Sequence, residues 1–128
     1  MKAMQSHILI IEDETDIREA LAEAFEAAHF TVSTADNGED GLAKAINTHP
    51  DIILLDIMMP KMDGHEVLRR LRQDAWGLRA KVIILTSMDD VQNIVTDYEG
   101  QIADYAIKVH HSLRDVIKKV QTALHIDD

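Results

Sequence analysis

Short apolar runs alternate along the chain with longer stretches in which apolar residues recur every three or four positions. The three strongest runs are too short for a helix, and their apolar residues are too continuous for a strand with one solvent-exposed face. Such runs are typical of parallel strands that are buried on both faces. They are Ile8–Ile11, Ile52–Leu55 and Val82–Leu85. Two weaker runs, Val32–Ala35 and Tyr105–Val109, predict edge strands.

Apolar residues at helical spacing fill the intervals after each of these runs. Each set predicts an amphipathic helix with one buried stripe. Ser112 and Asp115, three residues apart at the start of the last set, predict a capping box. The five stripes are Ile17, Leu21, Phe25 and Ala28; Leu42 and Ile46; Val67, Leu68 and Leu71; Val91, Ile94, Val95 and Tyr98; and Leu113, Val116, Ile117, Val120 and Leu124.

The strict alternation of five strands and five helices predicts an α/β fold. Crossovers between parallel strands are right-handed, which places helices on both faces of one parallel sheet, the doubly wound arrangement. A chain of 128 residues is long enough to bury a core of its own. No linker-like tract and no repeat interrupts the pattern, so residues 1–128 are expected to form a single domain.

Composition and charge restrict the surroundings and the partners of the chain. The sequence contains no cysteine, which removes disulfides and thiolate metal sites and is compatible with a reducing compartment, so the cytoplasm is expected. No run of 18 apolar residues occurs, so the chain is expected to be soluble and without a membrane partner. The formal net charge of −10 argues against direct nucleic-acid binding. The nearest thing to a basic patch, Arg69, Arg70 and Arg72, is interpreted as the solvated face of a helix.

Polar side chains stand at the ends of four of the five predicted strands. In an open parallel sheet, ligands bind in the crevice beyond the carboxyl ends of the strands. Each polar residue alone could be explained by a strand end that meets water, but the whole set is harder to explain that way. The set comprises Glu12, Asp13, Asp56, Thr86 and Lys108.

Three carboxylates gathered at one edge would repel one another. A pair about 5 Å apart costs roughly 3 kcal/mol at an effective dielectric constant of 20, and Lys108 alone offsets too little of this. A site with oxygen ligands and without His or Cys favours Mg²⁺, or Mn²⁺. Such an ion beside a free carboxylate, a hydroxyl and a lysine is suited to phosphoryl transfer. Asp56 could supply the nucleophile, because aspartyl phosphates are established covalent intermediates.

Four sequence blocks in order carry a resemblance to a known family. They are ILIIEDE at 8–14, IILLDIMMPKMDG at 52–64, VIILTS at 82–87 and DYAIK at 104–108. Over nearly its whole length the chain resembles the response-regulator receiver domains of two-component, phosphorelay signal transduction. The resemblance implies a flavodoxin-like (βα)5 three-layer sandwich with the parallel strand order 2-1-3-4-5.

The same resemblance implies a role for each residue of the site. Asp56 would take a phosphoryl group from a histidine kinase or phosphotransfer protein. Asp13, Asp56 and the backbone carbonyl of Met58 would bind Mg²⁺ directly, and Glu12 would act through a metal-bound water. Lys108 would pair with the phosphoryl oxygens.

Two further residues would transmit the signal. Thr86 would move its hydroxyl onto the phosphoryl group, and Tyr105 would turn inward in step with it, changing the surface of the fourth helix, fifth strand and fifth helix. That surface would meet a downstream protein, and the chain would be a monomer or a weak phosphorylation-dependent dimer. It would not be an enzyme beyond its own phosphorylation and slow dephosphorylation.

Departures from the family pattern carry expectations of their own. The family has a cis proline after the lysine, but Val109 follows Lys108 here. Because a cis bond before a non-proline residue costs about 3–4 kcal/mol, this loop is expected to be trans. Met58 and Met88 occupy positions that tune attack of water on the aspartyl phosphate in the family. Since neither side chain can orient a water, slow self-dephosphorylation is expected.

Two other readings of the sequence stay open. A degenerate receiver would keep the fold and work as a protein-binding module without phosphorylation; the intact acidic residues argue against it and Val109 leaves it open. A haloacid dehalogenase-type enzyme would need a second aspartate where Met58 stands. Glycine-rich nucleotide-binding motifs do not occur. The chain stops soon after the last predicted helix, so it is expected to be either a stand-alone regulator, which the short ending favours, or a part of a longer protein.

Overall fold

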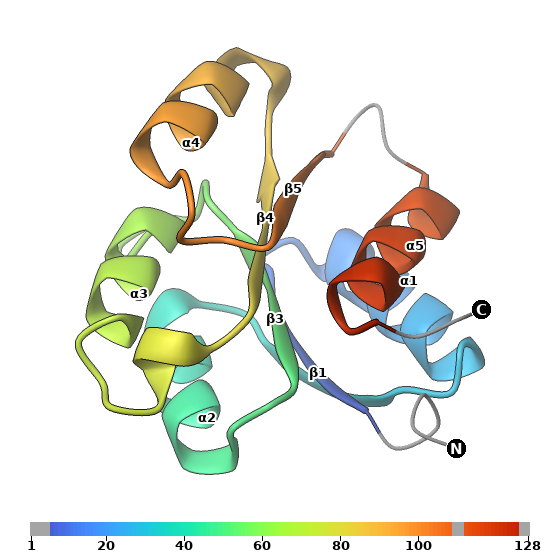
Figure 1. The fold of residues 1–128 in the computed structure, drawn as a ribbon. Coiled ribbons are helices and arrows are strands. Elements are labelled where there is room, and N and C mark those ends of the chain that lie inside the picture. The colour runs from blue at the N-terminus through green and yellow to red at the C-terminus, as the bar shows by residue number, and fades with distance from the viewer. Residues whose placement is uncertain (1–5, 109–111, 126–128) are drawn as a thin grey trace.

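Strands and helices alternate along the chain in the computed structural model, which describes residues 6–108 and 112–125 (Figure 1). All the predicted strands and helices are present. Tyr105–Val109 was predicted to be a strand, and the observed strand covers Asp104–Ile107, while Val109 lies outside the described residues. In order, the elements are β1 (His7–Ile11), α1 (Thr15–Ala27), β2 (Thr31–Ala35), α2 (Gly38–Thr48), β3 (Ile52–Asp56), α3 (Gly64–Leu71), η2 (Gly77–Arg79), β4 (Val82–Thr86), η3 (Met88–Asp90), α4 (Val91–Asp97), β5 (Asp104–Ile107) and α5 (Leu113–Ala123).

The five strands form one parallel sheet in the order β2-β1-β3-β4-β5. This order confirms the flavodoxin-like prediction, and β2 and β5 are the edge strands as expected. The register pairs Ile11 with Leu55, Asp56 with Leu85, and Thr86 with Ile107. The carboxyl ends of β1, β3, β4 and β5 therefore lie side by side at one edge of the sheet.

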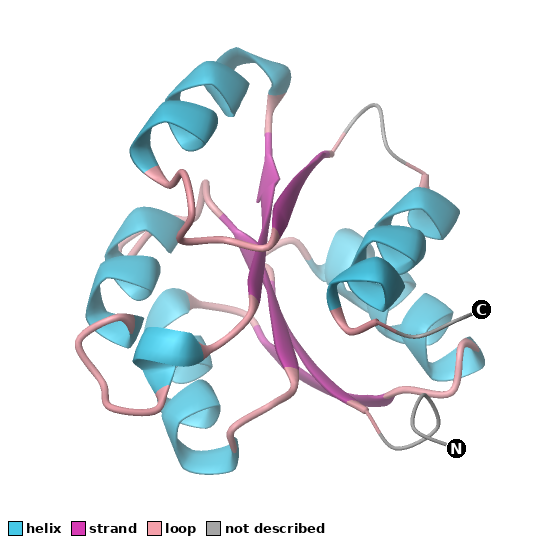
Figure 2. Cartoon of the chain, viewed as in Figure 1, coloured by secondary structure: helices cyan, strands magenta, loops and turns pink. Residues whose placement is uncertain are grey.

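Helices cover both faces of the sheet, with α1 and α5 on one face and α2, α3 and α4 on the other (Figures 1 and 2). Alternate residues of each strand enter two separate apolar cores. Ile8 and Ile10 pack with Phe25 of α1, whereas Leu9 and Ile11 pack with Leu68 of α3. Both cores need apolar side chains, which is why β1, β3 and β4 are continuous apolar runs. Among the described residues, no helix has the length and apolar character needed to cross a bilayer.

The capping box predicted for the last helix is present. The Ser112 hydroxyl accepts a hydrogen bond from the Asp115 amide at 3.2 Å, and the Asp115 carboxylate accepts one from the Ser112 amide at 3.3 Å. These reciprocal bonds satisfy two amide groups that the first turn of α5 would otherwise leave unpaired. The start of α5 is therefore fixed by its own sequence.

The prediction of a solvated arginine face on α3 is only partly right. Arg69 and Arg70 are exposed, and each lies 2.6 Å from a carboxylate oxygen of Glu66. Arg72 is half-buried instead, because its guanidinium donates to three backbone carbonyls at the far end of the sheet. These belong to Gly77, at 2.7 Å, Ala80, at 2.9 Å, and Gln101.

Candidate functional site

Four polar side chains reach one edge of the sheet because each stands at the end of a strand. Asp56 and Thr86 are the last residues of β3 and β4. Glu12 and Lys108 come directly after β1 and β5, where their amides continue the pairing of the sheet. The Glu12 amide donates to the Ala35 carbonyl and the Lys108 amide to the Thr86 carbonyl, each at 3.0 Å. The backbone at this edge is therefore held by the sheet itself.

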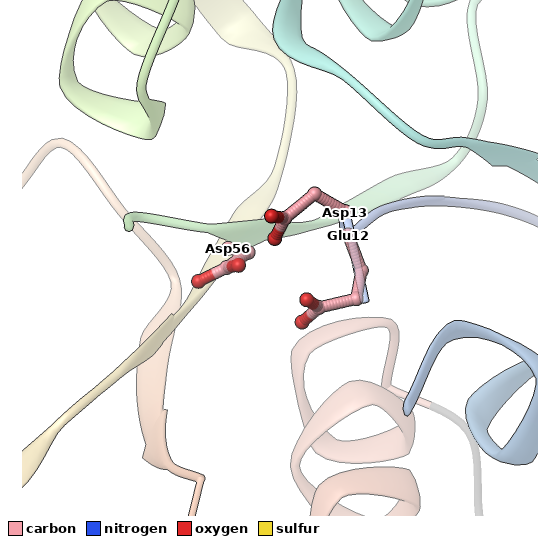
Figure 3. Close-up of side chains that lie close together, drawn as sticks. All are labelled: Glu12, Asp13 and Asp56. Atoms are coloured by element: carbon pink, nitrogen blue, oxygen red, sulfur yellow. The ribbon is translucent and has the colours of Figure 1, made fainter. Parts of the chain in front are cut away.

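Three carboxylates gather at this edge. Glu12, Asp13 and Asp56 each place an oxygen within 4.8 Å of the others. Figure 3 shows them turned toward a common space from the ends of β1 and β3. Glu12 and Asp56 are fully buried, while Asp13 is half-buried. Solvent therefore reaches the cluster from the side of Asp13.

Lys108 is the cation paired with the two buried carboxylates. Its Nζ lies 3.2 Å from Oε1 of Glu12 and 3.2 Å from Oδ2 of Asp56. The other oxygen of each group accepts a backbone hydrogen bond at 3.1 Å, Oε2 of Glu12 from the Glu14 amide and Oδ1 of Asp56 from the Met58 amide. Within the described part of the chain, Oε1 of Glu12 and Oδ2 of Asp56 accept no hydrogen bond of good geometry.

The burial of these groups sets their ionisation. Burial raises the pKa of Glu12 to about 7, against the hydrogen bond from Glu14 and the attraction of Lys108. Burial also raises the pKa of Asp56, and the Lys108 charge opposes this shift. Burial pulls the pKa of Lys108 down, but the attraction of Asp56 and Glu12 outweighs it and the pKa is raised overall. The cluster thus favours binding a further positive charge, either a proton or a metal ion.

The residues present fit a hard divalent cation. Two buried carboxylate oxygens lack a hydrogen bond, and the third carboxylate, Asp13, is open to solvent. Carboxylates without nitrogen or sulfur ligands suit Mg²⁺, which keeps several of its waters and needs few protein ligands. The cluster of Glu12, Asp13 and Asp56 therefore has the chemistry to hold such an ion.

Two other predicted site residues make their contacts elsewhere. Thr86 is fully buried, and its hydroxyl donates to the Ser87 carbonyl at 3.3 Å rather than to a carboxylate. Tyr105 is half-buried on β5, and Nζ of Lys119 lies 5.7 Å from the centre of its ring. The same Nζ pairs with Asp104 at 2.9 Å. The structure thus brings Glu12, Asp13, Asp56 and Lys108 together, whereas Thr86 and Tyr105 are bonded to neighbours outside the cluster.

Arg18 lies on α1 beside the cluster and was not predicted from the sequence to take part in the site. Its Nη1 donates to the backbone carbonyls of Glu12, at 3.0 Å, and Asp13, at 3.3 Å. A signal for it was present in the sequence. A cation in the first turns of a helix is disfavoured by the helix dipole, so an arginine there calls for a local partner.

Comparisons with known proteins identify the family. The family model for the response regulator receiver domain matches residues 8–121. Among curated proteins, a probable transcriptional regulator ycf27 from Cyanidium caldarium is 37% identical over 92% of this chain and 49% of its own length. The transcriptional regulatory protein ResD from Bacillus subtilis is 34% identical over 94% of this chain and 48% of its own length. A solved receiver domain protein from Clostridium thermocellum superposes with a TM-score of 0.84 at 25% identity, over 94% of each chain.

The chain spans about half the length of the curated relatives it matches. The match to the family model covers every element from β1 to most of α5. An acidic cluster such as Glu12, Asp13 and Asp56 is typical of the Mg²⁺ site of receiver domains, which interact with histidine kinases and are not catalytic enzymes. This protein therefore belongs to the response regulator receiver domain family of two-component signalling.

Proposed function

We propose that residues 1–128 act as one receiver domain that takes a phosphoryl group from a histidine kinase or phosphotransfer protein onto Asp56. One observation carries this proposal. The Asp56 carboxylate is fully buried among the acidic cluster, and Lys108 lies 3.2 Å from its Oδ2. That oxygen accepts no hydrogen bond from the described residues, so its lone pairs are available for attack on phosphorus.

The chain's own residues account for most of the chemistry. Oδ2 of Asp56 forms the new bond to phosphorus while the bond between phosphorus and the donor nitrogen breaks. The Met58 amide holds Oδ1 at 3.1 Å and so fixes the plane of the carboxylate. Lys108 places its ammonium where the charge of the transferred oxygens develops, which stabilises the transition state electrostatically.

A divalent cation completes the charge balance. When bound by Asp13, Asp56 and the Met58 carbonyl, with Glu12 acting through a water, Mg²⁺ or Mn²⁺ would neutralise the phosphoryl oxygens. The two buried oxygens without a hydrogen bond, on Glu12 and Asp56, support this assignment.

Phosphorylation is then expected to change the surface formed by α4, β5 and α5. A phosphoryl group on Asp56 offers the buried Thr86 hydroxyl a stronger acceptor than the Ser87 carbonyl, which it contacts at 3.3 Å. Movement of Thr86 would open space for the Tyr105 ring to turn inward. The altered surface would bind a downstream protein. The chain itself would be a monomer or a weak phosphorylation-dependent dimer.

Labelling with a small phosphodonor tests the proposal. The protein is incubated with Mg²⁺ and acetyl phosphate, and intact mass is expected to show one added phosphoryl group. Asp56→Asn should carry none, whereas Asp36→Asn, directly after β2 and outside the cluster, should label as the parent does. Full labelling of Asp56→Asn would reject the site. No labelling of the parent would favour a receiver that acts as a binding module without phosphorylation.

Slow self-dephosphorylation is expected of the labelled protein. The Met58 side chain, two residues after Asp56, is 63% exposed and apolar, so it cannot orient an attacking water. The Met88 side chain lies outside what the structure describes. The label is followed by intact mass after the donor is removed, and Met58→Asn should release it several-fold faster, because an amide can hold a water. A half-life of seconds for the parent would contradict this expectation.

A further inference from the structure

Arg18 holds the loop that carries two of the three carboxylates. One nitrogen of its guanidinium, Nη1, donates to the Glu12 carbonyl at 3.0 Å and to the Asp13 carbonyl at 3.3 Å. Within the described residues the structure records no ion pair between Arg18 and a carboxylate. Its Nη1 is therefore directed at the backbone of the acidic loop, and Arg18 does not occupy the carboxylate oxygens that would bind a metal ion.

Other contacts show how completely this loop is held. The Glu12 amide bonds the Ala35 carbonyl at 3.0 Å, the Glu14 amide bonds Oε2 of Glu12 at 3.1 Å, and the Arg18 amide bonds the Glu14 carbonyl at 2.9 Å. The carbonyls of Glu12 and Asp13 are the remaining acceptors of the loop, and both bond to Arg18. Each peptide group from residue 12 to residue 14 therefore has a partner that fixes its orientation.

We propose that Arg18 is a positioning residue for the metal site, which orients the peptide groups of Glu12 and Asp13 so that both carboxylates face Asp56. The inference deepens the proposed function, because the ion it serves is the cation of the phosphorylation reaction. Groups that orient metal ligands without touching the metal typically contribute about 10- to 100-fold to metal affinity.

Two physical effects of Arg18 predict opposite results, which makes the proposal testable. An arginine beside an acidic cluster repels a divalent cation, so removal of its charge alone would tighten Mg²⁺ binding. Loss of positioning would weaken Mg²⁺ binding, because the two peptide groups could then rotate and Asp13 would leave its place. The direction of the change in affinity therefore separates the two.

The experiment titrates Mg²⁺ into the full chain and follows backbone amide signals by NMR, without any phosphodonor. Arg18→Ala is expected to raise the Mg²⁺ dissociation constant about tenfold. Arg18→Lys keeps the positive charge and one amine that can reach a carbonyl. Its Mg²⁺ dissociation constant should therefore lie between those of the parent and Arg18→Ala. Arg79→Ala, an exposed arginine at the opposite end of the sheet, is the control and should bind Mg²⁺ as the parent does.

Acetyl phosphate labelling adds a second readout. At saturating Mg²⁺, Arg18→Ala and Arg18→Lys should reach the labelling rate of the parent within about twofold, with the Mg²⁺ requirement shifted upward. Unchanged or tighter Mg²⁺ binding in both variants would overturn the proposal, and so would a lower maximal rate at an unchanged dissociation constant. If Arg18→Ala does not fold, Arg18→Lys decides alone. A parent that binds Mg²⁺ but takes no label would refute the proposed function and leave the role of Arg18 intact.

Discussion

Glu12 is a carboxylic acid in a place where its charge is poorly solvated. It is fully buried, and Lys108 is shared between it and Asp56. One ammonium near two buried carboxylates leaves a net negative charge, which a low-dielectric environment disfavours. The site is therefore built at a cost to stability that a bound cation would offset.

This cost should appear as a dependence of stability on pH. The pKa of Glu12 is about 7 in the folded chain, above its ordinary value of 4.5, so the folded state holds the proton more tightly than the unfolded state does. The stability contributed by this proton is fully present below pH 4.5 and is lost as the pH rises through 7. Without Mg²⁺, we expect a loss of about 2 kcal/mol in the free energy of unfolding between pH 5 and pH 8 from this group.

Denaturant unfolding at the two pH values, with a metal chelator present, measures this loss. Glu12→Gln cannot ionise at this position and should show a correspondingly flatter dependence on pH. Mg²⁺ should restore much of the stability that the parent loses at pH 8. Equal pH dependence in the parent and Glu12→Gln would show that Glu12 is ionised in the folded chain throughout this range.

Some contacts of the site could be predicted from the sequence and others could not. Glu12, Asp13, Asp56 and Lys108 could be placed together because they follow predicted strands, and parallel strands end at one edge. The contacts of Arg18 could not be predicted, because it donates to the backbone carbonyls of Glu12 and Asp13. Their directions depend on how the chain turns between a strand and a helix, and apolar periodicity carries no information about that turn. Arg72 was misread for the same reason.

At the scale of elements, α3 is packed directly against the end of β3. A Cβ atom on Gly64, the first residue of α3, would lie 2.5 Å from the carbonyl oxygen of Asp56 and 2.6 Å from Cα of Ile57. The Gly64 amide also donates to the Ile57 carbonyl at 3.0 Å. The helix can approach β3 this closely only because residue 64 has no side chain.

Gly64→Ala should therefore disturb both stability and the site. We expect a loss of about 3 kcal/mol in the free energy of unfolding, because the atoms in contact are backbone and cannot rotate away. The displaced backbone of Asp56 should also slow labelling by acetyl phosphate. Gly100→Ala is the control. A Cβ atom there would have no neighbour within 4 Å, so the only cost is the backbone strain of an alanine at a φ of +79°. That strain costs about 1–2 kcal/mol and should leave labelling unchanged.

Most helix and strand boundaries could be predicted from apolar patterns and capping residues in the sequence. The exceptions have a physical cause. The four-residue apolar runs located β1, β3 and β4 because both faces of these strands are buried. The last strand was harder to delimit, since β5 is an edge strand of four residues with the burial pattern of a half-covered surface. The turn η2 between α3 and β4 has no apolar period of its own. It is held by tertiary contacts, among them the bond from Arg72 to the Gly77 carbonyl.

At the scale of the whole molecule, the acidic cluster and the surface of α4, β5 and α5 are connected through β4 and β5. Thr86 ends β4 and pairs with Ile107, while Tyr105 pairs with Ile84 two residues earlier on the same strands. In this structure Thr86 bonds the Ser87 carbonyl, and Lys119 of α5 stands over the Tyr105 ring. Both contacts would have to change if phosphorylation reached that surface.

The environment of Tyr105 on β5 should therefore change when Asp56 is phosphorylated, and Thr86→Val should abolish this change. The NMR signals of the Tyr105 ring are expected to shift when acetyl phosphate is supplied with Mg²⁺, because the ring leaves Lys119. Valine matches the shape of threonine but lacks the hydroxyl, so Thr86→Val should take the label on Asp56 while the Tyr105 signals stay where they are. Asp56→Asn should give neither label nor shift. A full Tyr105 response in labelled Thr86→Val would mean that the signal crosses the sheet by another route, since the hydroxyl is the only side-chain group of Thr86 that can donate a hydrogen bond to a phosphoryl oxygen.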